Sequence, residues 1–277
     1  MNIITKEDII AAAKHFTNES QMNYVSKEAA LSEDYVGMKI FDSPIFAFGN
    51  ADDMLYDEYK SPDIIGEHFL SPLKWLPEAK TVISFFLPYA DKIKYANSLN
   101  LDWPADEWLH GRIEGQFFLK ELTIYIHNIL SDAGYKSLIP NLDPRFKTGD
   151  SRSNNENTTN RFTSNWSERH IAYACGLGTF GLSKGLITEK GVCGRFGSIL
   201  TELDLEKDIR AYKDVYEYCT MCGLCIINCP VNAITKEGKN DLLCSDFLDK
   251  TFNKHNPRYG CGKCQVSVPC ESRAPSK

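Results

Sequence analysis

The stretch Tyr218–Thr235, YCTMCGLCIINCPVNAIT, carries four closely spaced cysteines that are followed by a proline. The spacing is C-x2-C-x2-C-x3-C-P, formed by Cys219, Cys222, Cys225, Cys229 and Pro230. A 4Fe–4S cluster needs four thiolates, and this signature supplies three of them on one tight loop while its fourth cysteine serves a second cluster. The spacing therefore predicts a redox site that holds two iron–sulfur clusters.

The C-terminal part of the chain supplies the thiolates that a second cluster needs. By the logic of two-cluster ferredoxins, a distant cysteine completes the first cluster and Cys229 belongs to the second. We predict that cluster 1 is held by Cys219, Cys222, Cys225 and Cys270, and cluster 2 by Cys229, Cys244, Cys261 and Cys264. The sequence PVNAIT after Cys229 matches the turn that follows the fourth cysteine in bacterial ferredoxins.

Zinc and disulfide bonds are the alternative readings of these cysteines. Structural zinc sites usually pair two CxxC motifs, not three cysteines at consecutive x2 spacing. Disulfides are favoured by export, and the N-terminal sequence MNIITKEDII has no basic region before an apolar core. Cys175 and Cys193 stand outside the set, and we interpret them as buried small hydrophobic residues or as neighbours of a cofactor.

The composition, with 43% hydrophobic and 25% charged residues, is that of a globular protein. No apolar run approaches the length of a membrane span, so we expect a cytoplasmic protein without a membrane partner. The net charge is −6, and it is unevenly spread, with +3 from Cys219 onward and −9 before it. An acidic balance of this kind does not favour a nucleic-acid binder.

Hydrophobic patterning predicts the elements that precede the cysteines. Thr5 and Asp8 form the capping box of a first helix over Lys6–Phe16. The apolar run Thr81–Leu87 predicts a central strand with both faces buried, and Glu107–Ala133 shows helical spacing. We also expect a long polar loop over residues 147–165 and a short helix over Trp166–Ala174. Two short strands are expected over Leu186–Thr188 and Phe196–Leu203.

These elements predict an α/β (α+β) fold in two domains. We expect residues 1–205 to form the α/β domain that binds cofactor and substrate. Residues 206–277 are expected to form a bacterial ferredoxin-like domain with the two clusters.

The sequence Gly176-Leu177-Gly178-Thr179-Phe180-Gly181 has the pattern G-x-G-x-x-G. A dinucleotide-binding fingerprint must follow a strand and open a helix. Here the preceding SERHIAYAC is helix-like and the following GLIT is strand-like, so we do not predict such a site. Glycines that merely turn the chain, or that let the backbone approach a large flat cofactor, are the remaining readings.

The segment SERHIAYACGLGTFGLSKGLITEKGVCGRFGSILTEL, residues 167–203, resembles the core of epoxyqueuosine reductases and reductive dehalogenases. The resemblance rests on Glu168-Arg169, the glycines, and Ile199 to Leu203. It is supported upstream by LPEAKTVI, residues 76–83, and downstream by the eight cysteines and Cys264-Gln265. The similarity extends over about residues 70 to 270 and identifies the chain as a short, divergent member of this group.

The resemblance implies a reductase in which two 4Fe–4S clusters deliver electrons to a cobalamin that reduces a bound substrate. The residues that it places against the corrin are Gly176, Leu177, Gly178, Gly181, Ser198, Ile199, Leu200 and Thr201. It also implies a low-potential electron donor such as ferredoxin or flavodoxin, a modified-nucleoside or small-molecule substrate, and anaerobic working conditions.

The chain departs from the family pattern at the proton donor. Epoxyqueuosine reductases carry an aspartate shortly before Glu-Arg, and Phe162 stands at that place here. Catalytic residues are therefore unknown from sequence, with His170, Tyr173 and Glu168 as weak candidates. Since the chain is acidic and lacks the aligned acid, a tRNA substrate is not favoured. The alternatives are a cytosolic dehalogenase-like enzyme acting on a small molecule, and a two-cluster electron carrier without corrinoid.

Overall fold

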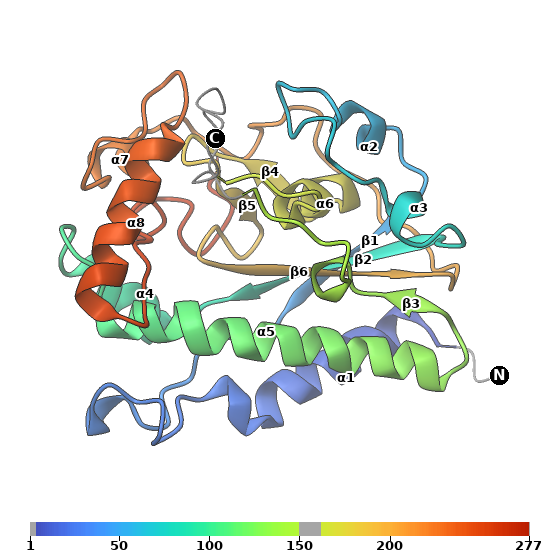
Figure 1. Cartoon of the computed structure of the whole chain (residues 1–277), viewed down its shortest axis with the longest axis horizontal. Helices are drawn as coiled ribbons and strands as arrows, with labels where there is room; N and C mark the ends of the chain where they lie inside the picture. The colour runs from blue at the N-terminus through green and yellow to red at the C-terminus, as the bar shows by residue number, and fades with distance from the viewer. Residues whose placement is uncertain (1–3, 150–161, 277) are drawn as a thin grey trace.

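The computed structural model describes residues 4–149 and 162–276. Its centre is an antiparallel sheet with the strand order β1-β2-β6-β3 (Figure 1). The strands are β1 (Ile45–Asn50), β2 (Thr81–Pro88), β3 (Ser137–Leu138) and β6 (Gly194–Thr201). Helices and loops cover both faces of this sheet (Figure 1), as in the predicted α+β class.

Strand β2 confirms the prediction of a two-sided central strand. All of its residues are buried, and it pairs with β1 on one edge and β6 on the other. Ile83 and Phe85 enter the core beneath the sheet, whereas Val82 enters the core above it. The β-branched and aromatic run is thus explained, because neither face of this strand meets water.

Helices α1 (Lys6–Glu19) and α5 (Asp106–Asp132) form the layer on one face of the sheet (Figure 1). The predicted capping box of α1 is present, with Thr5 and Asp8 bonding to each other's backbone N–H groups. On α5, Phe118 and Leu122 are fully buried against the sheet, as their spacing predicts. The two helices bury a continuous apolar core with β2 and β6.

The opposite face carries shorter elements. These are α2 (Leu55–Glu58), α3 (Pro72–Trp75), α6 (Glu168–Cys175) and the hairpin of β4 (Gly178–Phe180) with β5 (Leu186–Thr188). The predicted short helix and the first predicted short strand correspond to α6 and β5, and the second predicted strand corresponds to β6. The predicted loop over residues 147–165 falls largely outside the described residues.

The C-terminal part lies at one end of the sheet, at the left of Figure 1. It contains α7 (Leu224–Ile227) and α8 (Asp241–His255), and α4 (Asp91–Ser98) packs beneath it. Short 3-10 turns occupy Gln21–Asn23, Glu33–Tyr35 and Pro140–Leu142. The predicted division at residue 205 stays a prediction. Asp208, just beyond it, accepts a hydrogen bond from Phe48 N of β1 at 2.7 Å, so residues on either side of the division are in contact.

Candidate iron–sulfur site

The first three cysteines of the motif and Cys270 line a single pocket. Cys222 is exposed, and the other three thiols are half-buried. The loop turns tightly here, with Met221 at φ 53° and Gly223 at φ 79° just before α7. The structure thus brings together the four side chains predicted to hold cluster 1.

The chemistry of this pocket suits a cationic cluster core. Burial raises the pKa of the Cys270 thiol to about 12 and that of Cys225 to about 11, and the neighbouring thiols add to both rises. A metal centre compensates the charge of such thiolates and so favours them over the buried thiols. The donor set therefore fits a 4Fe–4S cluster, in which iron supplies that charge.

The second group combines three segments of the C-terminal part. Cys244 lies in the first turns of α8, Cys229 follows α7, and Cys261 and Cys264 lie on the loop after α8. Burial raises the pKa of the Cys264 thiol, and the charges of Cys244 and Cys229 raise it further. The Cys229 sulfur also accepts a hydrogen bond from Ala233 N at 3.2 Å. These four thiols are the set predicted for cluster 2.

Within residues 4–149 and 162–276, no three side chains of His, Cys, Asp or Glu converge closely enough to hold a single metal ion. The four thiols of the first pocket are nevertheless arranged around one space.

The glycine motif follows α6 and opens strand β4, which is the reverse of a dinucleotide fingerprint. Gly176 ends α6 in the left-handed conformation, at φ 102°. A Cβ on Gly178 would stand 2.0 Å from the Ile187 carbonyl oxygen, so close pairing of β4 with β5 requires glycine there. A Cβ on Gly181 would lie 3.8 Å from the Cys219 sulfur. The motif therefore places its last glycine at the cluster 1 pocket.

Four of the eight residues predicted to line a corrin are covered by protein in the described structure. Ser198, Ile199, Leu200 and Thr201 belong to the centre of β6, pair with β2, and are at most 1% exposed. Ser198 Oγ accepts a hydrogen bond from Trp166 Nε1, and Thr201 Oγ1 donates one to Lys136 O. The contacts of these four residues are thus supplied by protein, and the β6 part of the predicted lining offers no open surface to a flat macrocycle.

His170 is held by its neighbours. Its ring lies 5.2 Å from Tyr59 and 4.9 Å from Phe180, measured between centroids, and Nδ1 is 2.8 Å from Ser167 Oγ. Burial, assisted by the charge of Arg169, lowers the pKa of His170 to about 4. The imidazole is therefore neutral at pH 7 and cannot act as an imidazolium acid.

Tyr173 belongs to the same aromatic group. Its ring packs 5.0 Å from Tyr212 and 5.9 Å from Phe180, and its carbonyl accepts a hydrogen bond from the Tyr212 hydroxyl. Burial raises the pKa of the Tyr173 phenol. These contacts are those of a packing residue at the edge of α6.

Glu168 differs from the other two candidates, because its carboxyl group is incompletely bonded. Oε1 accepts a hydrogen bond from Asn141 Nδ2 at 2.5 Å, whereas Oε2 and Asn141 Oδ1 are both buried without a partner among the described residues. Burial raises the pKa of Glu168 to about 7, although the nearby Ser198 and Trp166 donors act in the opposite direction. A protonated carboxyl would bring an O–H donor to a place where two acceptors lack one.

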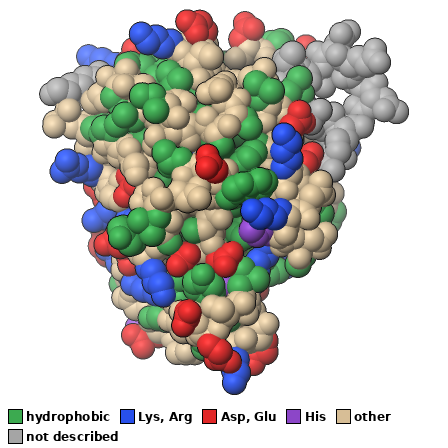
Figure 2. All heavy atoms as spheres, turned by 90° about the vertical axis from the view of Figure 1, so that its left-hand side faces the viewer, with side chains coloured by type: hydrophobic (Ala, Val, Ile, Leu, Met, Phe, Trp, Pro, Cys, Tyr) green, Lys and Arg blue, Asp and Glu red, His purple; other side chains and the backbone are tan. Residues whose placement is uncertain are grey.

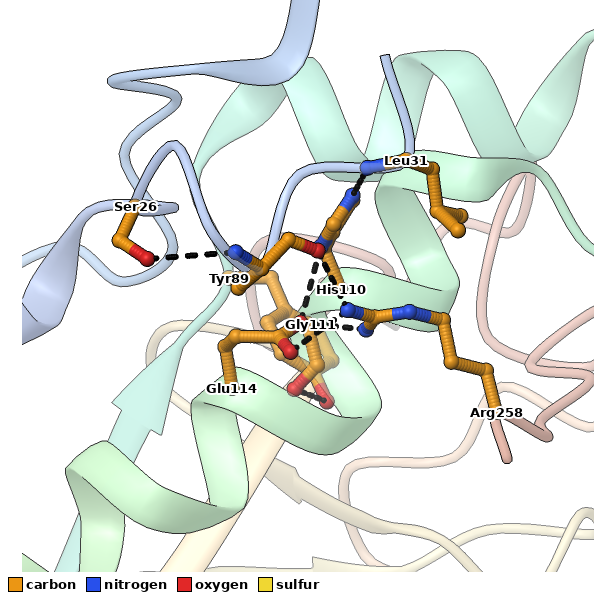
Figure 3. Close-up of polar contacts among 8 residues, drawn as sticks. Ser26, Leu31, Tyr89, His110, Gly111, Glu114 and Arg258 are labelled. Carbon is orange, nitrogen blue, oxygen red and sulfur yellow. Dashed lines mark hydrogen bonds and ion pairs between the residues drawn. The ribbon is translucent and has the colours of Figure 1, made fainter. Parts of the chain in front are cut away.

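A network that the sequence did not reveal ties the cluster-binding segment to α5 (Figure 3). His110 is fully buried, with Nδ1 2.8 Å from a Glu114 oxygen and Nε2 accepting from Leu31 N at 3.3 Å. Arg258, three residues before Cys261, donates to both Glu114 oxygens at 2.5 and 2.7 Å. Burial raises the pKa of Glu114, but the hydrogen bonds from His110 and Arg258 hold it below its ordinary value.

A buried lysine forms a second tie between the two parts. Lys263 stands between Cys261 and Cys264, and its Nζ donates to both the backbone and side-chain oxygens of Asn97 at 2.7 Å. Asn97 Nδ2 in turn donates to Cys261 O at 3.0 Å. In the sequence, the position of this lysine between the two cysteines of a CxxC motif could have indicated the anchor. The loop that carries two cluster 2 ligands is thereby fixed to α4.

Comparisons with known proteins agree with this site. The family model of the 4Fe-4S binding domain matches residues 212–235. An epoxyqueuosine reductase of Bacillus cereus is 25% identical over 235 residues, covering 76% of this chain and 53% of that protein. One from Vibrio cholerae is 30% identical over 120 residues, covering 39% of this chain and 31% of that protein.

Solved structures show the same fold. A crystal structure of epoxyqueuosine reductase matches with a TM-score of 0.54 and 20% identity, over 98% of this chain and 69% of that chain. Another, in complex with an epoxyqueuosine-modified tRNA stem loop, matches with a TM-score of 0.54 and 20% identity, over 98% and 66%. A reductive dehalogenase described as B12-dependent matches with a TM-score of 0.54 and 13% identity, over 83% and 30%.

The chain resembles epoxyqueuosine reductases in sequence and in fold. The predicted resemblance and the predicted fold class are therefore confirmed. The chain spans about half the length of the Bacillus cereus relative and about a third of the Vibrio cholerae one. Across the part of the chain that the structure describes, helices long and apolar enough to cross a bilayer are absent.

Proposed function

We propose that the protein is an iron–sulfur oxidoreductase that passes single electrons through two 4Fe–4S clusters to a bound substrate. The observation that carries the proposal is the pocket at which Cys219, Cys222, Cys225 and Cys270 meet the turn at Gly181. This turn belongs to the segment that resembles epoxyqueuosine reductases. A two-cluster electron carrier would not need the large α+β part, so an enzyme is the favoured form of the proposal.

Electrons are proposed to enter at cluster 1. Cys222 is its exposed ligand, and the side chains around it include Met221, Leu224 and Ile227, which are 46%, 37% and 74% exposed. Figure 2 views the molecule from the side of α7 and α8, and hydrophobic side chains are visible in several groups across this face. Such a surface suits transient docking of a low-potential donor such as ferredoxin or flavodoxin.

Glu168 is the proposed source of the proton that accompanies reduction. Of the three candidates, it alone combines a carboxyl group with a pKa of about 7, so the acid and the carboxylate are both populated near neutral pH. His170 is neutral and Tyr173 is a packing residue. Glu168 thereby takes the place of the acid that the family carries at the position of Phe162.

Cobalamin remains part of the proposal through the relatives. The dehalogenase with the same fold is described as B12-dependent, and a corrin would supply a metal centre able to reduce a carbon atom directly. The four residues on β6 that were expected to line it are covered by protein, so a bound corrin would contact other groups. Direct measurement of binding decides this component separately from the clusters.

Two substrate classes are proposed. The sequence relatives favour a modified nucleoside, and one matching structure holds a modified tRNA stem loop. The net charge of −6 and the phenylalanine at the family's acid position favour a small molecule. The two differ in the number of phosphate contacts that binding would form.

The deciding experiment is anaerobic purification followed by an iron count and absorption spectra with and without cobalamin. About eight irons per chain support the two-cluster proposal, and a shift of added cobalamin to the base-off spectrum supports corrin binding. Zinc in place of iron would overturn the whole redox proposal. Affinity for tRNA is then measured against salt, where phosphate contacts give a steep negative slope of log K.

A further inference from the structure

Two arginines lie where α5 and β6 meet the loop that follows α8. Arg112 belongs to α5 and Arg195 is the second residue of β6, and these two elements pack against each other. Gln116 lies one turn beyond Arg112 on the same face of α5, and its Oε1 accepts a hydrogen bond from Arg195 Nη2. The side chains of the two arginines are therefore neighbours at this face.

The loop after α8 closes the other side of Arg112. Arg112 Nη2 donates a hydrogen bond to the Tyr259 hydroxyl at 2.6 Å, and its guanidinium carbon lies 4.6 Å from the centre of the Tyr259 ring. A Cβ on Gly260 would lie 3.7 Å from Arg112 Cβ, so the loop backbone packs directly against α5. The arginines thus lie at the boundary between the α+β part and the segment that leads into Cys261.

Neither guanidinium group is neutralised by a carboxylate. Within residues 4–149 and 162–276 neither of them forms an ion pair, whereas three other arginines each pair with an aspartate or glutamate, namely Arg145, Arg210 and Arg258. In the same ranges Arg195 Nε is buried without a hydrogen-bond partner. Burial lowers the pKa of Arg112, and the nearby charge of Arg195 lowers it further, although neighbouring tyrosines act in the opposite direction. Two like charges therefore stand close together, and one buried donor is unused.

The charge and the geometry of this pair suit a phosphate group. Arg112 and Arg195 are half-buried and Gln116 is exposed, so a ligand can approach from solvent. A planar guanidinium group donates two parallel N–H bonds to the oxygens of a phosphate or a carboxylate. A phosphate monoester carries about two negative charges at pH 8, which matches two uncompensated cations. A carboxylate or a phosphodiester carries a single charge and would compensate only one of them.

We propose that Arg112 and Arg195 form a binding site for a dianionic phosphate, either inorganic phosphate or the phosphate end of a small monoester. Gln116 is the positioning residue, because its side-chain oxygen holds Arg195 beside Arg112. A phosphate bound there joins α5 and β6 to the loop that leads into Cys261. The proposal does not depend on the metal content of the thiol groups.

The test is isothermal titration calorimetry of the anaerobically purified chain at pH 8 and constant ionic strength. We expect one inorganic phosphate per chain, bound at least about tenfold more tightly than acetate or dimethyl phosphate, which each carry one charge. Arg112→Gln and Arg195→Gln should each weaken phosphate binding about tenfold or more, because each removes a charged hydrogen-bond donor. Adenosine monophosphate is titrated in parallel: tighter binding than inorganic phosphate supports a monoester as the ligand, and weaker binding supports the free ion.

Gln116→Glu is the most direct variant, because it alters an exposed side chain and gives Arg195 a carboxylate of its own. It should fold as the wild type does and bind phosphate about tenfold more weakly. Asn128→Asp is the matched control, since it makes the same amide-to-acid change at an exposed position about three turns further along α5. It should leave the affinity unchanged, because solvent ions screen charge over such a distance.

Three results would overturn the proposal. Phosphate would bind no more tightly than acetate, Gln116→Glu would bind phosphate as tightly as the wild type, or Asn128→Asp would weaken binding as much as Gln116→Glu does. Thermal denaturation of each variant shows that it is folded. If an arginine variant does not fold, Gln116→Glu and its control decide the matter.

Discussion

Replacing Glu168 with glutamine isolates the free energy of burying one carboxyl group. Its pKa rises from 4.5 to about 7, because burial disfavours the carboxylate. The folded chain therefore binds one more proton than the unfolded chain between these pH values, and stability falls as the pH rises through this window. At 1.36 kcal/mol for each unit, the wild-type protein loses about 3 kcal/mol between pH 4.5 and pH 7.

Glu168→Gln removes this titration and keeps an oxygen that can accept from Asn141. We expect the variant and the wild type to be equally stable at pH 4.5. At pH 8 the variant should be more stable by up to about 3 kcal/mol, a rise of several degrees in the apparent melting temperature for a chain of this size. Anaerobic thermal denaturation across this range measures the difference, with Glu206→Gln, an exposed residue, as the matched control.

A constant difference between the variant and the wild type from pH 4.5 to pH 8 would refute the reasoning. It would mean that the carboxyl is charged throughout and that a partner compensates it. Infrared difference spectra of the same two proteins give an independent measurement, since only a protonated carboxyl has a C=O stretch that the variant lacks. If activity is found, loss of its neutral-pH dependence in Glu168→Gln would support the proton-donor proposal.

Three further predictions concern the clusters and their support. Cys270→Ser should lower the iron content from about eight toward four atoms per chain, while the cluster assigned to Cys244 is retained. An unchanged iron content would contradict the assignment of Cys270 to cluster 1. Ile227→Asp should slow reduction by ferredoxin roughly tenfold, the effect of losing about 1.4 kcal/mol of docking energy, and leave reduction by dithionite unchanged; equal slowing with both reductants would place entry elsewhere. Arg258→Met should cost about 3–5 kcal/mol because Glu114 is left buried without its counter-charge, and adding Glu114→Gln should recover part of it in thermal denaturation.

Local signals explain the elements that could be predicted from the sequence. The run TVISFFL is apolar at every position but Thr81 and Ser84, and only a two-sided strand accommodates it. The capping box of Thr5 and Asp8 acts within a single turn. The cysteine spacing specifies the first cluster loop because its three ligands belong to one segment.

Features that depend on distant partners could not be predicted in this way. The glycines suggested a flat cofactor, but Gly178 is required by the Ile187 carbonyl of the neighbouring strand. Ser198 to Thr201 were assigned to a corrin by resemblance, whereas the sheet register buries them. The buried network of His110 includes Glu114 and Arg258, which are 144 positions apart in the chain. No local sequence pattern predicts a contact of this range.

Arg258 has a consequence beyond stability. Besides Glu114, it donates to Ala29 O at 2.7 Å, close to where Leu31 N reaches His110. One guanidinium group thus joins the N-terminal segment to the loop that leads into Cys261. We expect that removing iron frees that loop and makes the segment around Ala29 easier for a protease to cut. The extent of cleavage near the N-terminus would serve as a gauge of how completely the clusters, at the far end of the chain, have been assembled.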